Sequence, residues 1–208
     1  ISGLTLEING HEMTSRLVGR FNAYNLLVAF AVGKYLGQDE LSLLTILSSV
    51  KAPQGRFEYF LSDHKITAVI DYAHTPDALE NVLKTLLDLK KGTEKLITVF
   101  GCGGNRDKGK RPLMGEIASR LSDQVLITSD NPRNEDPDSI INEIYHGVPS
   151  VLKEKVFTVT DRMEAIEMAC NIASGGDIIL IAGKGHENYQ IIGNESLHFD
   201  DMGNTINI

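Results

Sequence analysis

The sequence predicts an α/β protein in which a mostly parallel, Rossmann-like sheet carries helices on both faces. Two observations lead to this fold class. From Phe57 onward, β-rich runs alternate with helical runs, and alternation at this spacing favours parallel strands joined by crossover helices. Before that point, the stretch Ala52-Pro53-Gln54-Gly55 breaks the pattern of a segment that has a different character. We therefore expect one domain over residues 1–54 and a second over residues 55–208.

The first domain is expected to contain a strand and two helices. Leu4 to Ile8 alternate as a strand does, and Asn9-Gly10 has the composition of a hairpin turn. Residues 21–36 form a helix that is apolar nearly all round, and Gly37 suits its C-terminal end. Residues 39–50 follow as a second, amphipathic helix.

The second domain is expected to alternate strands and helices. The helix that starts at Pro76 is the best marked, because Thr75 can cap it, proline suits its first position, and leucine and valine recur on one stripe. Asp136 and Pro137 repeat this pattern of cap and proline. The expected strands cover residues 57–61, 66–70, 96–100, 125–128, 156–159 and 178–182, and the expected helices start at Pro76, Pro112, Pro137 and Asp161.

Four loops of this domain are expected to form a ligand site. In sheets of this kind, ligands bind outside the carboxyl ends of the strands. The loops that follow the strands there are DYAHTPD after Ile70, GCGGNRDKGKRP after Phe100, SDNPRNEDP after Thr128 and GKGHENY after Ala182. All four are richer in glycine and in charged residues than a plain connection requires.

Composition excludes several classes of function. The net charge of −8 disfavours binding to nucleic acid or to a membrane surface. No apolar stretch approaches the length of a membrane span, and the first residues lack the pattern of a signal peptide. The two cysteines, Cys102 and Cys170, do not make a disulfide framework, so a cytoplasmic location is expected.

The glycine-rich loops match no complete cofactor motif. After Gly101-Cys102-Gly103, the third glycine of a dinucleotide-binding G-x-G-x-x-G pattern would fall at Arg106. A phosphate loop ending at Gly183-Lys184 would need glycine at Ile178 and a hydroxyl residue after the lysine. His186-Glu187 lacks the second histidine of a zinc helix, so no metal ligand is assigned. Cys102 has no evident partner base and is better explained as a small buried thiol.

The charged residues that remain suit a small zwitterion. The fork of Arg106 or Arg133 can take a carboxylate, and the carboxylates of Asp130 and Glu187 can accept from an ammonium group. A solvated cluster of salt bridges explains the same residues equally well. Arg133 is the most informative of them, because the turn chemistry of the surrounding Asp-Asn-Pro run does not require a guanidinium.

At these loops the sequence closely resembles the Mur ligase family, and in particular its diaminopimelate-adding branch. The stretches that carry the resemblance are GRFNAYNLLVAFAVGKYLG, APQGRFE, VIDYAHTPDALENVL, VFGCGGNRDKGKRPLMGEIA, TSDNPRNEDP and IAGKGHENYQ. In that branch the Asp-Asn-Pro-Arg run marks the diaminopimelate site. The resemblance implies that residues 1–54 are the end of a central ATPase domain and that residues 55–208 are the Rossmann-like C-terminal domain that presents the amino acid.

The resemblance also implies a reaction and a set of site residues. ATP, with Mg²⁺, would activate the D-glutamate carboxylate of a UDP-N-acetylmuramoyl dipeptide as an acyl phosphate, which an amine of meso-diaminopimelate would attack. Asn25, Arg56 and, with less support, Asp71 would serve the nucleotide. The residues implied at the amino-acid site are Arg106, Asp130, Asn131, Pro132, Arg133, Gly183 and Glu187.

Two features depart from the family pattern. The 208 residues contain no phosphate loop and no UDP-sugar domain, and the last residues, DDMGNTINI, stray from the usual ending. We therefore expect this chain to be the C-terminal portion of a ligase and to be inactive alone. The alternatives are an amino-acid-binding module without catalysis and a related ligase that adds lysine or extends folylpolyglutamate; the Asp-Asn-Pro-Arg run and the GKGHE loop disfavour the related ligases.

Overall fold

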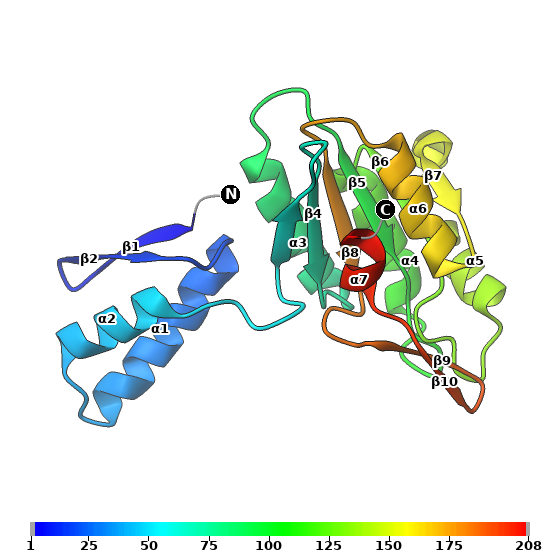
Figure 1. Cartoon of the computed structure of the whole chain (residues 1–208). Coiled ribbons are helices and arrows are strands. Elements are labelled where there is room, and N and C mark those ends of the chain that lie inside the picture. The colour runs from blue at the N-terminus through cyan, green and yellow to red at the C-terminus, as the bar shows by residue number, and fades with distance from the viewer. Residues whose placement is uncertain (1–2, 207–208) are drawn as a thin grey trace. The chain divides into compact units, whose positions relative to one another are not determined.

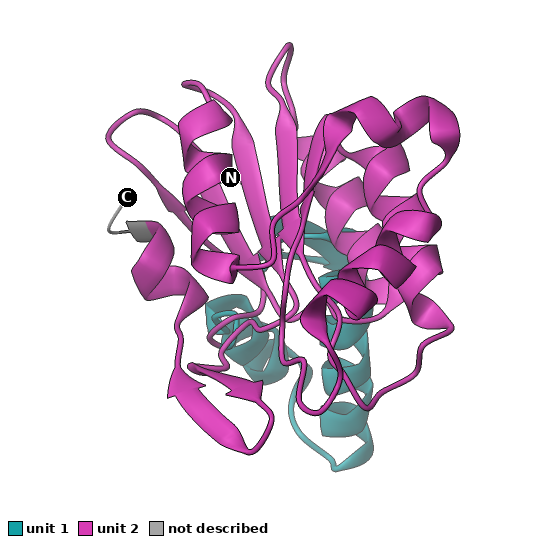
Figure 2. Ribbon diagram, turned by 90° about the vertical axis from the view of Figure 1, so that its right-hand side faces the viewer, with its two compact units in different colours: residues 1–53 teal, residues 54–208 magenta. Residues whose placement is uncertain are grey.

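The computed structural model describes residues 3–206, and the chain divides into two compact units, residues 1–53 and 54–208. Figure 2 shows the two units in different colours. In the first, strands β1 (Leu4–Ile8) and β2 (His11–Ser15) pair in antiparallel fashion. Asn9 and Gly10 both have positive φ angles, 52° and 81°, which is the conformation that a tight hairpin turn requires.

Two helices complete the first unit. They are α1 (Arg20–Tyr35) and α2 (Glu40–Ser49), which Asp39 caps by accepting from the backbone N–H of Ser42 at 2.9 Å. Leu26 and Phe30 of α1 pack with Leu44 and Leu47 of α2 and with the hairpin in one hydrophobic core. This unit therefore has a core of its own.

The second unit is built on a six-stranded sheet with the order β3-β4-β8-β5-β6-β7 (Figure 1). Strands β4, β8, β5, β6 and β7 are parallel, whereas β3 pairs with β4 in antiparallel fashion. The strand bounds are Glu58–Leu61 (β3), Thr67–Asp71 (β4), Leu96–Phe100 (β5), Gln124–Ile127 (β6), Val156–Thr158 (β7) and Ile178–Ala182 (β8).

Helices cover both faces of this sheet (Figure 1). On one face α3 (Pro76–Leu89), α4 (Lys110–Leu121) and α5 (Pro137–His146) pack side by side. On the other, α6 (Arg162–Ile172) packs through Ala165, Ile166 and Ala169 against β5, β6 and β8, and α7 (Asp201–Ile206) lies beside it. Because strand side chains point alternately to the two faces, buried strands with helices on both sides are apolar at almost every position.

The predicted fold class is confirmed, with local differences. The helices expected at Pro76 and Pro137 begin there, and the expected caps Thr75 and Asp136 accept from backbone N–H groups. Helix α4 begins two residues before Pro112, since proline is tolerated anywhere in a first turn. Five elements within residues 3–206 were not predicted: strand β2, the 3₁₀ helix η1 (Ser150–Lys155), the hairpin of β9 (Tyr189–Ile192) and β10 (Glu195–His198), and α7. Within residues 3–206, no helix has the length and apolar character that crossing a membrane requires.

Candidate functional site

The four loops singled out from the sequence meet at one edge of the sheet. Their strands are neighbours in the order β4-β8-β5-β6. The strand ends are level as well, because Ala182 is in register with both Asp71 and Phe100, and Phe100 with Ile127. A cavity of about 370 Å³ lies at this edge, and all four loops line it. Of the seven residues expected at an amino-acid site, six line the cavity: Arg106, Asp130, Asn131, Arg133, Gly183 and Glu187.

The amide of Asn131 connects three parts of this site. Its Nδ2 donates to Oε2 of Glu187 at 2.9 Å. Its Oδ1 accepts from Nζ of Lys184 at 3.1 Å and from the backbone N–H of Ile191 at 2.9 Å. The loop after β6 is thereby tied to the loop after β8 and to β9, so Asn131 orients its neighbours as well as lining the cavity.

Asp130 lines the cavity and, within the described residues, has one carboxylate oxygen without a hydrogen bond. Its side chain is buried, and its Oδ1 accepts no hydrogen bond from any residue in the described range 3–206. The nearest cation is the Lys184 ammonium, 3.5 Å from that oxygen. Gly183 has a φ of 118°, and a Cβ at this position would lie 2.8 Å from Oδ2 of Asp130. The glycine therefore leaves room for the Asp130 carboxylate at the wall of the cavity.

Arg133 is held by its backbone and by one nitrogen of its guanidinium. Nη1 donates to the carbonyl of Gly104 at 3.0 Å and to that of Asn131 at 3.3 Å, whereas no residue in the described range accepts from Nε or Nη2. Its backbone pairs with β9 and has a φ of 53°, which is strained for any residue with a Cβ. The remaining donors of a partly fixed guanidinium are thus left for an acceptor in the cavity.

Pro132 and Arg106 contribute differently. Pro132 is buried and does not line the cavity. A Cβ on residue 104 would lie 1.9 Å from its carbonyl oxygen, so the loops after β5 and β6 touch backbone to backbone at Gly104. Arg106 is exposed at the rim and has no ion-pair partner among residues 3–206. Pro132 shapes the loop, and Arg106 is free to bind an anion.

Tyr72 connects Glu187 with Arg56. Its hydroxyl donates to Oε1 of Glu187 at 3.3 Å, and the guanidinium carbon of Arg56 lies 4.5 Å from the centre of its ring. Burial raises the pKa of Tyr72, and the Glu187 carboxylate raises it further. The phenol therefore stays protonated and serves as a donor. The ring of His74 contacts the same tyrosine and binds its carbonyl.

Arg111, which lies near the candidate site in sequence, is a structural residue. Its side chain is fully buried and forms a bidentate pair with Glu135, at 2.9 and 3.0 Å, and a bond of 2.7 Å to Glu143. Hydrogen bonds from Arg111 and from the backbone of Asn105 hold the pKa of Glu135 at about 2. This cluster joins the loop after β5 to the loop after β6, and its guanidinium is not available to a ligand.

The residues expected to serve a nucleotide are divided between the two units. Both oxygens of Asp71 accept backbone N–H groups, from Phe57 at 2.7 Å and from Ala73 at 2.8 Å, and burial raises its pKa. Arg56 is exposed and can reach an anion. Asn25 belongs to the first unit, where its Nδ2 donates to Asn22 at 3.1 Å. Asp71 is therefore engaged in fixing the start of β3.

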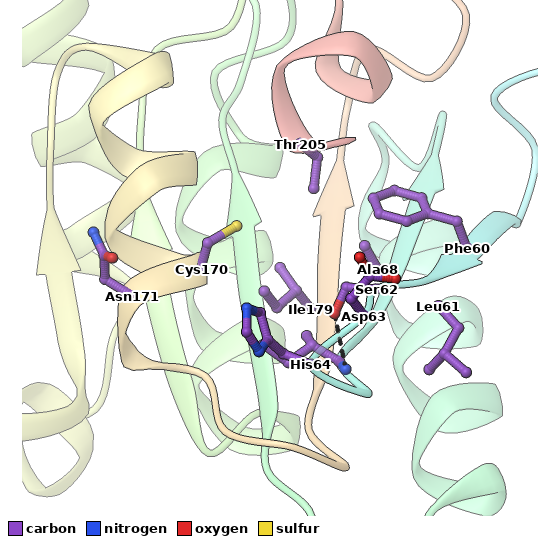
Figure 3. Close-up of a pocket in the computed structure, with 11 residues that line it drawn as sticks. Phe60, Leu61, Ser62, Asp63, His64, Ala68, Cys170, Asn171, Ile179 and Thr205 are labelled. Atoms are coloured by element: carbon purple, nitrogen blue, oxygen red, sulfur yellow. Dashed lines mark hydrogen bonds between the residues drawn. The ribbon is translucent and has the colours of Figure 1, made fainter. Parts of the chain in front are cut away.

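The cysteines and a second cavity lie outside this site. Cys102 is a buried residue of the loop after β5, and burial raises its pKa to about 12, which disfavours the thiolate form that a nucleophile needs. Cys170 points into another cavity of about 520 Å³, whose walls include Ala68 and Ile179 near the amino ends of β4 and β8 (Figure 3). None of the residues predicted for the ligand site lines it. No group of three or more His, Cys, Asp or Glu side chains in the described range could hold a metal ion.

Comparison with known proteins identifies the family. Residues 55–185 match the family model described as Mur ligase, glutamate ligase domain. The chain is 54% identical, over 201 residues, to the UDP-N-acetylmuramoyl-L-alanyl-D-glutamate–2,6-diaminopimelate ligase of Cytophaga hutchinsonii, covering 97% of this chain and 41% of that protein. The ligase of the same name from Parabacteroides distasonis is 51% identical and is also covered to 41%. This chain thus spans about two fifths of the length of these relatives.

Solved structures of related proteins are also similar to this chain. A structure of a UDP-N-acetylmuramoyl-L-alanyl-D-glutamate–2,6-diaminopimelate ligase superposes with a TM-score of 0.70 at 40% identity, over 97% of this chain and 41% of that one. A folylpolyglutamate synthase from Mycobacterium tuberculosis, complexed with ADP and AMPPCP, gives a TM-score of 0.69 at 22% identity, over 88% of this chain and 43% of that one. The second likeness concerns the fold alone.

Proposed function

The chain belongs to the Mur ligase family, and from this premise we propose that its second unit binds meso-diaminopimelate for an ATP-driven ligation. The amino acid would be joined through an amide bond to UDP-N-acetylmuramoyl-L-alanyl-D-glutamate, the substrate in the names of its relatives. Residues 1–54 would be the end of the ATP-binding domain, and residues 55–208 the domain that presents the amino acid. We place the reaction in the cytoplasm, since free cysteines suit a reducing compartment.

The observation that carries this proposal is the pairing of an unsatisfied buried carboxylate with unsatisfied guanidinium donors in one cavity. Oδ1 of Asp130 lacks a hydrogen bond from the described residues, and Arg133 keeps Nε and Nη2 unused within the same range. meso-Diaminopimelate carries two carboxylates and two ammonium groups. Asp130 and Glu187 would accept from one ammonium group, and Arg133 and Arg106 would take carboxylates through charge-assisted hydrogen bonds.

In this reaction the residues of the second unit act by positioning. Bound ATP would supply the phosphoryl group that turns the D-glutamate carboxylate into an acyl phosphate with a good leaving group. The ammonium group held by Asp130 and Glu187 would mark the anchored end of the diaminopimelate, and the arginines would fix its carboxylates. The amine at the other end, neutral after losing a proton to solvent, would then face the acyl carbon, from which phosphate leaves as the amide bond forms. Holding the two reactants in place removes much of the entropic barrier to a bimolecular step.

Part of a nucleotide site fits the residues of this chain. The exposed guanidinium of Arg56 suits a phosphate, and the exposed amide of Asn25 can donate to a base. Asp71 would act near the nucleotide chiefly by holding the backbone of Phe57 and Ala73, because each of its oxygens accepts a backbone N–H group. The described residues offer no cluster for Mg²⁺, so we assign no metal ligand among them.

Calorimetric titration of the 208-residue chain tests the proposed amino-acid specificity. meso-Diaminopimelate should bind, and lysine should bind much more weakly, because lysine lacks the second carboxylate for an arginine fork to grip. Equal affinities would favour a lysine-adding enzyme or a general amino-acid module. A lack of heat with either amino acid, from a chain whose fold is verified by circular dichroism, would contradict the proposal.

A further inference from the structure

Lys184 is a fully buried lysine at the edge of the candidate site. It lies between Gly183 and Gly185, whose φ angles are 118° and 53°. A Cβ on residue 185 would come within 2.7 Å of the Tyr72 side chain and within 2.6 Å of the Gly55 carbonyl. The two glycines therefore allow the chain to turn at the end of β8 and to direct the lysine inward. Burying an ammonium group is costly unless it is paired, so this arrangement calls for an explanation.

The partners of the ammonium are all acceptors. Nζ donates to the carbonyl of Tyr189 at 2.7 Å and to Oδ1 of Asn131 at 3.1 Å, and it lies 3.5 Å from Oδ1 of Asp130. An ammonium has three donors, and these three oxygens surround it. Burial lowers the pKa of Lys184, whereas the negative charge of Asp130 raises it. Lys184 does not line the cavity, so it does not contact a ligand there directly.

The ammonium determines which way the amide of Asn131 faces. Oδ1 of Asn131 is placed between two donors, Lys184 and the Ile191 N–H, and this leaves Nδ2 directed at the Glu187 carboxylate. Without Lys184, the only one of these two donors left at Oδ1 would be the Ile191 N–H, so the Asn131 amide could rotate at the cost of a single hydrogen bond there. The rotation would turn Nδ2 away from Glu187, which would lose its amide donor. Lys184 also faces Asp130, the other acid of the cavity, at 3.5 Å.

We propose that Lys184 is a positioning residue for the amino-acid pocket. Its ammonium holds Asn131 and Asp130 directly, and Glu187 through Asn131, in the arrangement that receives the ammonium group of the ligand. The proposal rests on the proposed function, because it assigns the pocket to an amino acid. Beyond that function, Lys184, which lies outside the pocket, would set the positions of the two acidic residues of the pocket, Asp130 and Glu187.

The test replaces Lys184 by methionine, which has a side chain of similar length without a charge. Lys84→Met is the matched control, because Lys84 is exposed on α3 and pairs with the exposed Glu80 on the same helix. In the ligand-free 208-residue chain, nuclear magnetic resonance follows the side-chain amide of Asn131, assigned by its loss in Asn131→Asp. In Lys184→Met the amide protons should shift and exchange with water about tenfold faster, as expected for the loss of one hydrogen-bonded orientation. Lys84→Met should leave them unchanged.

Calorimetry with meso-diaminopimelate gives the second readout. Lys184→Met should weaken binding by about 10- to 100-fold, and Lys84→Met should not. An unchanged Asn131 signal in a folded Lys184→Met chain overturns the proposal, and so does a shifted signal with unchanged affinity. If the unaltered chain does not bind diaminopimelate but the Asn131 signal shifts in Lys184→Met, the proposed function fails while the positioning by Lys184 is supported.

Lys184→Met leaves Asp130 without its cation and can therefore prevent folding. Lys184→Gln is the second variant, since its amide remains able to donate one hydrogen bond but carries no charge. The same two readouts apply to it, with the same expected direction and the same outcomes against the proposal.

Discussion

At the scale of single residues, Arg133 combines a strained backbone with a partly unused side chain. A φ of 53° costs on the order of 1 kcal/mol for a residue other than glycine. The hairpin strand β9 holds this conformation, because the N–H and the carbonyl of Arg133 bond Ile191 at 3.0 Å and Gly193 at 2.7 Å. In this backbone conformation the guanidinium bonds the Gly104 carbonyl and lines the cavity. The Arg133 side chain can therefore contact a ligand there.

Arg133→Ala should weaken the binding of meso-diaminopimelate by about 2–4 kcal/mol, because it removes a charge-assisted pair at a partly desolvated site. Alanine also carries a Cβ, so the backbone strain is similar in both proteins and the change reports on the side chain. Arg133→Lys should recover only part of the loss, since an ammonium cannot reproduce the planar fork. Calorimetry with diaminopimelate and with lysine should show a smaller ratio between the two affinities in Arg133→Ala than in the unaltered chain.

The matched control for Arg133 is Arg120→Ala, which removes an exposed arginine that pairs with Glu116 on α4. It should leave both affinities unchanged. An unaltered ratio of affinities in Arg133→Ala, with thermal stability intact, would show that Arg133 does not recognise the amino acid.

The limit of sequence-based prediction is clearest for Lys184 and Asp71. The position of Lys184 between two glycines resembles part of a phosphate loop. Lysine is rarely buried, and nothing local showed that the ammonium is enclosed by oxygens of Asp130, Asn131 and Tyr189. The DYAH loop likewise gave no sign that the Asp71 carboxylate is bound at both oxygens by backbone N–H groups. By contrast, Asp130, Arg133 and Glu187 could be placed together, because strand order and the carboxyl-end rule bring their loops to one edge.

At the scale of elements, the helices that were predicted carry local sequence signals, whereas the elements that were missed are fixed by tertiary contacts. The helices at Pro76 and Pro137 carry a cap and a proline within their own sequence, and both begin there. The β9–β10 hairpin is largely exposed and has no alternation of apolar and polar residues, so periodicity could not reveal it. Helix α7 is fixed by Asp201, whose carboxylate pairs with the buried Arg162 at 2.7 Å. A contact of this kind has no signature in a short window of sequence.

The connection between α4 and the loop after β6 should be sensitive to acid. The pKa of Glu135 is about 2, below its ordinary value of 4.5. Its ionised form therefore stabilises the fold above pH 4.5, and this contribution is lost as the pH falls through 2. Glu135→Gln should lower the free energy of unfolding at pH 7 by about 1–2 kcal/mol, because Arg111 loses its bidentate partner but keeps its ion pair with Glu143.

Urea titrations of both proteins at a series of pH values measure this effect. The difference between unaltered chain and Glu135→Gln should shrink steadily between pH 4.5 and 2. Glu116→Gln, which removes an exposed charge on the same helix, is the control and should change stability by less than about 0.5 kcal/mol. A difference that does not depend on pH would contradict the assignment of the low pKa to this pair.

At the scale of the whole molecule, the 208 residues should not bind ATP tightly by themselves. A phosphate cradle needs successive backbone N–H groups and a lysine that reaches the phosphates, and no G-x-x-x-x-G-K-[ST] sequence occurs in the chain. Arg56 and Asn25 are side-chain donors and do not supply such a run of backbone N–H groups. Calorimetry with Mg-ATP should therefore show at most weak binding, and submicromolar affinity would contradict this prediction. The diaminopimelate titration in the same buffer verifies that the sample is active in binding.

The first unit has an apolar surface that should promote self-association. Leu26 and Phe30 of α1 pack into the core, yet Tyr24, Val28 and Val32 recur at a spacing of four on another face and are 61%, 64% and 53% exposed. Residues four apart lie on one side of a helix, so they form a continuous stripe. Contiguous apolar surface of this kind usually marks an interface, and in a solution of this chain the partner at hand is a second copy.

Sedimentation velocity over a range of concentrations tests this last prediction. The unaltered chain should associate as concentration rises and should enhance the fluorescence of a hydrophobic dye. Val28→Lys together with Val32→Lys should reduce both effects, because lysine ammonium groups are not readily desolvated at an interface. The control is Val151→Lys, which places the same charge at an isolated, 82% exposed valine of the second unit. If the double variant associates as strongly as the Val151→Lys control does, the stripe on α1 is not the surface through which copies of this chain meet.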